Sequence, residues 1–195
     1  MSTRCIIAQE TAGGWEGRYC HFDGYPKGIG VTLYNAFDGH FGRDLQALQK
    51  FLIDDHPAGW SGLVDCDFSK KPGYTDDTDD DRPRCYCHGQ RREQATLFTQ
   101  RSHLRGMEWL YILRAVNDTP CMDVYELRWP DGVDPWQEEV QKQKIHRARV
   151  VLTAPPPDWE KVAYSRVERA TPPDWTDPPE AWSKYAEEVT LQLFV

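Results

Sequence analysis

The chain has 195 residues and a formal net charge of -8 at pH 7, from 31 acidic and 23 basic residues. A chain of this length fits one domain, or one domain with an appended segment. The acidic balance argues against a protein that binds nucleic-acid phosphates through clustered lysine and arginine, so a nucleic-acid partner is not expected.

The chain has no apolar stretch near the roughly 20 residues that a membrane-spanning helix needs. Its start, Met1 to Arg4, leads directly into a predicted strand without the apolar region of a signal peptide. We therefore expect a cytoplasmic protein without membrane contact, whose cysteines are thiols or metal ligands and not disulfides. The cysteines are Cys5, Cys20, Cys66, Cys85, Cys87 and Cys121.

Two strands are predicted at the start of the chain. Residues 3–9 and 15–22 have the composition of strands, and the turn at Gly13 and Gly14 between them favours a β-hairpin. Such a hairpin would bring Cys5 and Cys20 close together across the sheet.

Two short helices are predicted next. Apolar residues recur at helical spacing between Ile29 and Phe37. Asp44 is a favourable N-cap for a second helix, which carries an apolar stripe and ends before His56 and Pro57. Both helices are expected to pack on the sheet.

The periodicity is lost between residues 65 and 106. Within this insertion, the acidic run from Asp76 to Asp81 is predicted to be solvated, because it lacks the glycine and terminal glutamate spacing of a calcium loop. Regular patterns return at residue 108. Strands are predicted at 108–114 and 121–129, where they form a second hairpin, and at 149–153 and 189–195. Helices are predicted at 160–169 and 179–188.

These elements predict an α+β fold. We expect a mostly antiparallel sheet of about five or six strands, with helices packed on one face and a long irregular insertion. Residues 1–153 would form the core domain, with the insertion at about 65–106. Residues 154–195 would form a segment rich in proline and tryptophan that packs on this core.

Two stretches of the chain carry a family resemblance. Ser2-Thr3-Arg4 and the run CHFDGYPKGIG at residues 20–30 resemble a group of small uncharacterised proteins of tailed bacteriophages and prophages. Members of that group open with Ser/Gly-Thr-Arg and carry His-Trp-Asp-Gly-Tyr-Pro before a glycine and a helix. This chain has Phe22 where tryptophan is usual and Cys5 where serine is usual.

The resemblance extends over roughly residues 1–130. Residues 60–63 (WSGL), 85–88 (CYCH) and 108–111 (EWLY) are also similar to that group. The resemblance implies a phage-encoded accessory protein made in the host cytoplasm. It implies no established activity, so the catalytic residues, and whether the protein is an enzyme, stay open.

The corner formed by residues 21–30 is the first candidate site. Free backbone N–H groups at a helix start, together with Lys27, favour an anion such as phosphate. His21 and Asp23 would supply a base with its orienting group, or two metal ligands. The alternative is structural, with the turn and glycines serving helix entry and packing. The candidate ligand-binding residues are His21, Asp23, Tyr25, Lys27, Gly28 and Gly30.

The second candidate is a metal site formed by Cys85, Cys87 and His88. Thiolate and imidazole groups are the ligands that Zn²⁺ prefers. No second Cys-x-x-Cys or His-x₃-His pair completes the site, so the fold would have to bring in another ligand. The candidates for that role are Cys66, His103 and the pair Cys20-His21. The alternative is a short strand whose cysteines are buried without metal.

The leading functional prediction is a non-enzymatic, host-modulating or counter-defence protein that binds a host or viral protein and requires no cofactor. It rests on the acidic charge, the irregular segments and the lack of a catalytic motif. One alternative is binding or cleavage of a nucleotide or other phosphorylated ligand at the corner formed by residues 21–30. The other is a zinc-stabilised structural module.

Overall fold

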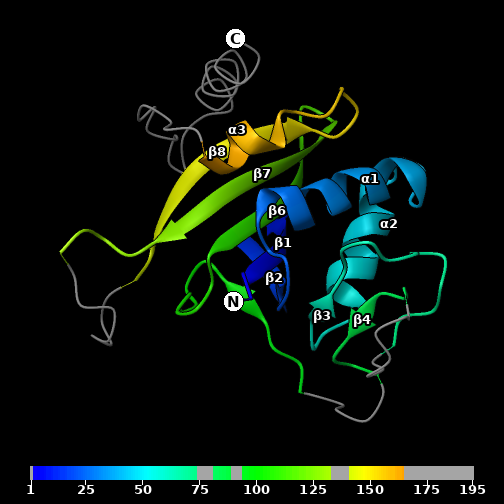
Figure 1. Cartoon of the computed structure of the whole chain (residues 1–195), viewed down its shortest axis with the longest axis horizontal. Coiled ribbons are helices and arrows are strands. Elements are labelled where there is room, and N and C mark those ends of the chain that lie inside the picture. The colour runs from blue at the N-terminus through cyan, green and yellow to red at the C-terminus, as the bar shows by residue number, and fades with distance from the viewer. Residues whose placement is uncertain (1, 74–80, 89–93, 133–140, 165–195) are drawn as a thin grey trace.

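A computed structural model describes residues 2–73, 81–88, 94–132 and 141–164 and has a mixed sheet with helices, an α+β arrangement (Figure 1). The strands are β1 (Cys5–Thr11), β2 (Gly14–Cys20), β3 (Trp60–Gly62), β4 (Arg84–Cys85), β5 (Phe98–Thr99), β6 (Trp109–Val116), β7 (Thr119–Arg128) and β8 (Gln143–Val151). The helices are η1 (Pro26–Gly30, π-helical), α1 (Val31–Gly39), α2 (Leu45–Gln49), η2 (Lys50–Asp54, π-helical) and α3 (Trp159–Tyr164).

The sheet has eight strands within the described residues, in the order β4-β3-β2-β1-β6-β7-β8, and β5 pairs with β2. Most pairings are antiparallel, as predicted, but β1–β6 and β2–β3 are parallel. The expected count of five or six strands was therefore too low. The additional strands β3, β4 and β5 have only two or three residues each, too few to show alternation in the sequence.

The predicted N-terminal hairpin is confirmed. β1 and β2 pair antiparallel with Cys5 opposite Cys20, and Gly14 enters β2 with a φ of 124°, which favours glycine. The strand predicted at 149–153 corresponds to β8. It is longer than expected and starts earlier, at Gln143. The predicted strand at 189–195 and helix at 179–188 lie outside the described residues.

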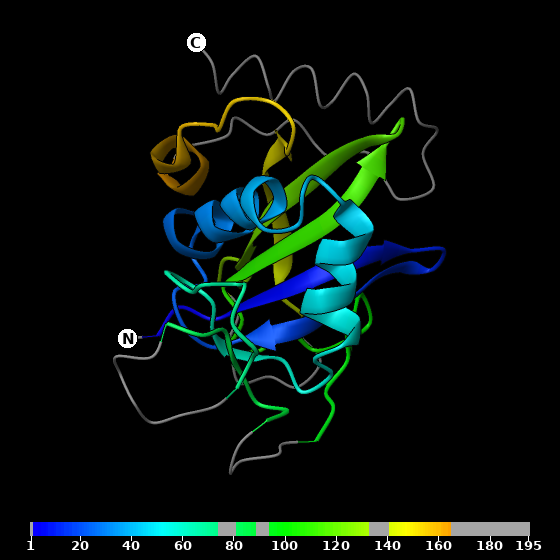
Figure 2. The same cartoon turned by 90° about the vertical axis from the view of Figure 1, so that its right-hand side faces the viewer.

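Side chains of β1 alternate between two apolar clusters. Cys5 and Ile7 join a large cluster with residues of α1, α2, η2 and α3, and Figure 2 shows α1 and the α2–η2 helix lying in front of the strands. Ile6 and Ala8 join a smaller cluster with Trp15, Leu110 and Ile112 on the other side of β1. This alternation is the period of two expected of a strand that is buried on both faces.

The helix starts follow from local sequence. The Asp44 carboxylate accepts a hydrogen bond from the Ala47 N–H at 3.0 Å, which confirms the predicted N-cap of α2. Asp158 caps α3 in the same way through the N–H groups of Glu160 and Lys161. No helix in the described ranges is both long and apolar enough to cross a membrane.

Candidate functional site

The corner at residues 21–30 is fixed mainly by its backbone. The Gly24 N–H donates to the Thr3 carbonyl at 2.9 Å, and the Gly24 carbonyl accepts the buried Tyr111 hydroxyl at 2.8 Å. Asp23 adopts a left-handed conformation with a φ of 56°. A side chain at position 24 would meet Cys5 Cβ at 2.8 Å, so glycine is required by close approach of β1.

The N–H groups at the start of η1 have protein partners. The Gly28 N–H donates to the Tyr25 carbonyl at 2.9 Å, and the Ile29 N–H donates to the Asp23 carbonyl at 3.0 Å. A Cβ atom at Gly30 would lie 2.7 Å from Cζ3 of Trp159, so this glycine lets the indole of α3 pack on the helix. Gly28 and Gly30 therefore have structural roles at this corner.

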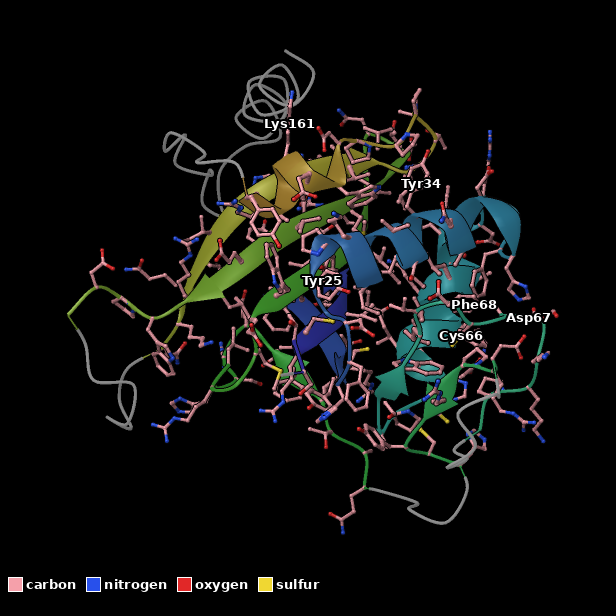
Figure 3. The ribbon with its side chains drawn as sticks, in the orientation of Figure 1. Tyr25, Tyr34, Cys66, Asp67, Phe68 and Lys161 are labelled. Carbon is pink, nitrogen blue, oxygen red and sulfur yellow. The ribbon has the colours of Figure 1, made fainter. Side chains whose placement is uncertain are left out.

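The corner side chains point to separate neighbours. His21 Nδ1 lies 2.5 Å from the Tyr19 hydroxyl, and Lys27 Nζ lies 2.5 Å from a Glu160 carboxylate oxygen on α3. Asp23 and Tyr25 are exposed; Tyr25 is labelled in Figure 3. Ligand binding here stays a prediction, since the known partners of these groups all belong to the protein.

A second group of side chains converges around the end of β4. Ligand atoms of His56, Cys85 and Cys87 all lie within 4.8 Å of one another. His56 follows η2, Cys85 ends β4, and Cys87 lies in the turn after it. The structure thus adds His56 to two of the three predicted metal ligands.

Strand pairing and backbone hydrogen bonds bring this cluster together. Trp60 of β3 pairs with Cys85, and the Tyr86 N–H donates to the Gly59 carbonyl at 3.0 Å. The Ala58 N–H points at Cys87 Sγ over 3.2 Å. These contacts join the residues after η2 to residues 85–87, which are about 30 positions further along the chain.

His56 has the chemistry of a metal ligand. Its side chain is 5% exposed, and its Nδ1 atom has no hydrogen-bond partner among the described residues. Burial, with a smaller contribution from His88, lowers the pKa of His56 to about 4, against an opposing effect of Asp55. The imidazole is therefore neutral at pH 7 and keeps a lone pair available for a metal.

His88, the third predicted ligand, lies beside the same cluster. Its Nδ1 atom is 2.8 Å from Cys85 Sγ, and the His56 and His88 rings are 5.3 Å apart. Burial raises the pKa of Cys85 to about 11, so without metal this thiol stays protonated. Together the four side chains present two sulfur and two nitrogen donors.

The other suggested ligands do not join this group. Cys66 Sγ instead lies 3.4 Å from the Arg82 carbonyl, and among the described residues neither His103 nor Cys20-His21 belongs to the cluster. His56 was not predicted as a ligand, because His56 and Pro57 together are typical of the end of a helix. The only sequence feature that could have indicated this role is the position of His56 between an apolar helix and Trp60.

Three comparisons with known proteins give no relative. No family model matches the chain, and neither the curated proteins nor the solved structures contain a match. The resemblance to phage accessory proteins therefore stays a prediction, and the function has to be inferred from the chain's own residues.

Proposed function

We propose that His56, Cys85, Cys87 and His88 bind one zinc ion and that this protein is a zinc-stabilised module. The observation that carries the proposal is the buried His56 imidazole, whose Nδ1 has no hydrogen-bond partner among the described residues and lies close to two thiols. Buried polar atoms nearly always have a partner, so a donor set of this composition favours a metal ion.

The distances in the cluster suit a tetrahedral zinc site after a small contraction. With Zn–S near 2.3 Å and Zn–N near 2.0–2.1 Å, ligand atoms in a tetrahedron lie about 3.3–3.8 Å apart. Three of the donors are within 4.8 Å of one another. His88 is not one of these three, and its Nδ1 lies 2.8 Å from Cys85 Sγ, so to become the fourth ligand it would have to move away from that sulfur and towards the other donors.

Four protein ligands would make the site structural. A catalytic zinc site keeps one position open for water or substrate, whereas a closed site contributes to folding. Here the ion would join the segment after η2 to residues 85–88, which lie in a part of the chain with little regular structure. The ion would thereby restrain a region that short strands alone hold weakly.

Metal analysis of the purified full chain tests the proposal. Protein from zinc-supplemented cells is expected to carry one zinc ion per chain, and Cys87→Ser and His56→Ala are expected to lose it. Cys66→Ser is the matched control, because Cys66 is also half-buried and close in sequence yet contacts backbone carbonyls. It should keep the full zinc content.

Cobalt substitution tests the ligand set. Co²⁺ in a site with two thiolates gives charge-transfer absorption and the d–d bands of tetrahedral coordination. His88→Ala should change the d–d bands without abolishing binding if His88 is the fourth ligand. Less than about half an equivalent of zinc in the wild-type protein, with none taken up on addition, would end the proposal.

A binding role for the module is the second candidate function. We propose, in line with the predicted phage accessory role, that the protein acts by binding a host or viral protein in the cytoplasm. The supporting observation is an open groove of about 440 Å³ beside α1. A pull-down from host lysate, compared with the groove variants described below, tests this role.

A further inference from the structure

The groove lies between helix α1 and the segment at residues 64–68. Figure 3 labels Cys66, Asp67 and Phe68 on this segment, near the α1 ribbon. On the helix side the lining residues recur every three or four positions from Gly28 to His40, so they form one continuous helix face. The groove therefore follows the length of the helix.

On the helix side, several of the residues that line the groove have small side chains or none. Gly28, Ala36 and Gly39 line the groove, and a Cβ atom added at Gly39 would meet nothing within 4 Å. The face from Lys27 to His40 is about 20 Å long at 1.5 Å per residue. An extended peptide of about six residues matches this length.

The segment at residues 64–68 gives the groove two acidic side chains. Asp65 and Asp67 line it and are exposed, and the Asp67 carboxylate accepts two hydrogen bonds from Ser69. The ring of Phe68 lies 6.1 Å from that of His40, which places this part of the segment at the end of α1. The negative end of the helix dipole adds to the two carboxylates.

The outer wall of the groove is joined to the metal cluster by hydrogen bonds. The Asp67 N–H donates to the Asp81 carbonyl at 2.7 Å, and the Cys66 thiol lies 3.4 Å from the Arg82 carbonyl. The Cys85 N–H donates to the Gly73 carbonyl at 3.1 Å. Residues 64–73 are thus attached to the strand that carries Cys85.

We propose that the groove along α1 binds an extended peptide segment carrying arginine or lysine, and that metal at the His56 cluster is required to keep its outer wall in place. The basic side chain would pair with Asp65 and Asp67, while apolar side chains would contact Val31, Val64 and Phe68. The metal dependence rests on the proposed zinc site, and the peptide preference rests on the groove alone.

Fluorescence anisotropy with two labelled hexapeptides tests this inference on the full chain. One peptide alternates leucine with arginine, and the other has glutamate in place of arginine. At about 0.15 M salt, where exposed charges are largely screened, the arginine peptide should bind the zinc-loaded protein at least about tenfold more tightly than the glutamate peptide.

Two glycine variants distinguish the groove from other surfaces. Gly39→Trp places an indole in the groove and should weaken binding of the arginine peptide about tenfold or more. Gly13→Trp is the matched control, since a Cβ at Gly13 also meets nothing within 4 Å but lies in the β1–β2 turn. It should leave affinity unchanged. Equal binding by both variants would place the peptide elsewhere and overturn the inference.

Removal of metal separates this inference from the proposed zinc site. Chelation should release zinc and weaken arginine-peptide binding about tenfold, and added zinc should restore both. A chain that never carries zinc refutes the zinc site and the metal dependence. Zinc release without any change in peptide affinity refutes the metal dependence alone. Failure of the zinc-loaded protein to prefer the arginine peptide refutes the peptide preference.

Discussion

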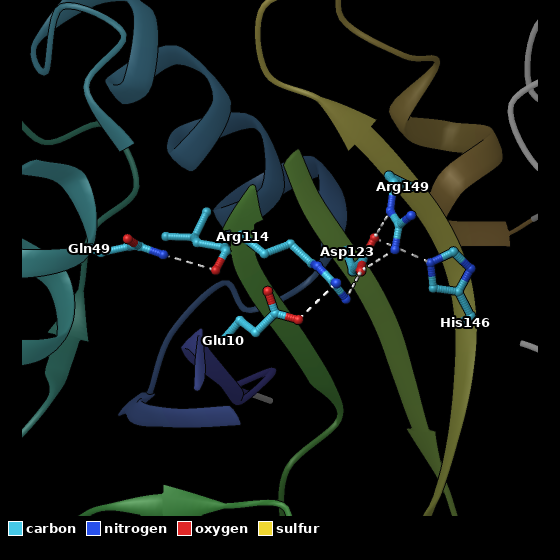
Figure 4. A network of polar contacts seen from close by, with 7 residues as sticks. Glu10, Gln49, Arg114, Asp123, His146 and Arg149 are labelled. Atoms are coloured by element: carbon cyan, nitrogen blue, oxygen red, sulfur yellow. Dashed lines mark hydrogen bonds and ion pairs between the residues drawn. The ribbon is translucent and has the colours of Figure 1, made fainter. Parts of the chain in front are cut away.

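Two buried polar centres in this molecule differ in how their charges and lone pairs are satisfied. In the sheet, Arg149 donates two hydrogen bonds to the Asp123 carboxylate, at 2.6 and 2.8 Å, and Arg114 pairs with Glu10 at 2.8 Å (Figure 4). At the end of β4, the ligand atoms of His56, Cys85 and Cys87 lie within 4.8 Å of one another, and His56 Nδ1 has no hydrogen-bond partner among the described residues.

The difference follows from the backbone that carries each centre. Asp123 and Arg149 are directly opposite in the long β7–β8 pairing, so regular strand geometry places each side chain against its partner. Cys85 instead ends a two-residue strand and Cys87 follows it, so no long ladder fixes their positions. A regular sheet can satisfy buried charges by itself, whereas an irregular segment gains most from an external ion.

Breaking the sheet centre should give the largest effect. Asp123→Asn keeps the shape of the side chain but leaves the buried Arg149 guanidinium without its carboxylate, which costs roughly 3–5 kcal/mol. Urea unfolding of the metal-loaded protein measures this loss. Asp38→Asn removes an exposed ion pair with Arg43 and is the control; it should change stability by less than about 1 kcal/mol.

The contribution of Asp123 to stability should also depend on pH. Burial alone would raise the pKa of Asp123, but the two hydrogen bonds from Arg149, with a smaller effect of the His146 ring 3.7 Å away, outweigh it and hold the pKa well below its usual value. Its stabilising contribution is therefore complete above the ordinary aspartate pKa of about 3.9 and declines as the pH falls below it. The stability gap between wild type and Asp123→Asn should be smaller at pH 3 than at pH 7. A constant gap would contradict this.

Removing metal should lower the local stability around His56, Cys85 and Cys87 only. Chelation is expected to speed amide hydrogen exchange in residues 56–62 and 84–88 by about tenfold or more, equivalent to about 1.4 kcal/mol of local stability. Strands β6, β7 and β8 should keep their protection, because their polar groups need no ion. A uniform loss of protection across the chain would show that the two centres are not independent.

A mutation of Trp60, which packs against His56, should give the smallest effect. Trp60 contacts the His56 ring at 4.5 Å between centroids and donates its indole N–H to the Leu52 carbonyl at 2.8 Å. Trp60→Phe loses that hydrogen bond, at a cost of about 1 kcal/mol, and should weaken zinc binding about tenfold by loosening His56. Competition with a zinc indicator measures the affinity, and an unchanged value would remove Trp60 as a positioning residue.

Local patterns in the sequence predicted the local structure. The Gly13-Gly14 turn predicted the hairpin, Asp44 predicted a helix start, and residues 108–114 and 121–129 predicted the antiparallel pair that β6 and β7 form. In each case the pattern and the contact lie within about 20 residues, where turn and cap chemistry determine the outcome.

Contacts between distant segments could not be predicted in this way. The parallel pairing of β1 with β6 and the approach of His56 to Cys85 join residues far apart in the chain. The start of β8 was missed because polar residues such as His146 and Arg147 hide a strand that is buried. Their partners, and not their own polarity, make that burial favourable.

The parallel alignment of β1 beside β6 has a consequence for the newly made chain. As the polypeptide leaves the ribosome, the hairpin of β1 and β2 emerges about a hundred residues before the strand that covers its inner edge. Until then that edge, with the apolar side chains of Ile6 and Ile7, is open to other nascent chains. Slow translation between these strands would therefore favour aggregation, and a chaperone that shields the first hairpin would raise the yield of native protein.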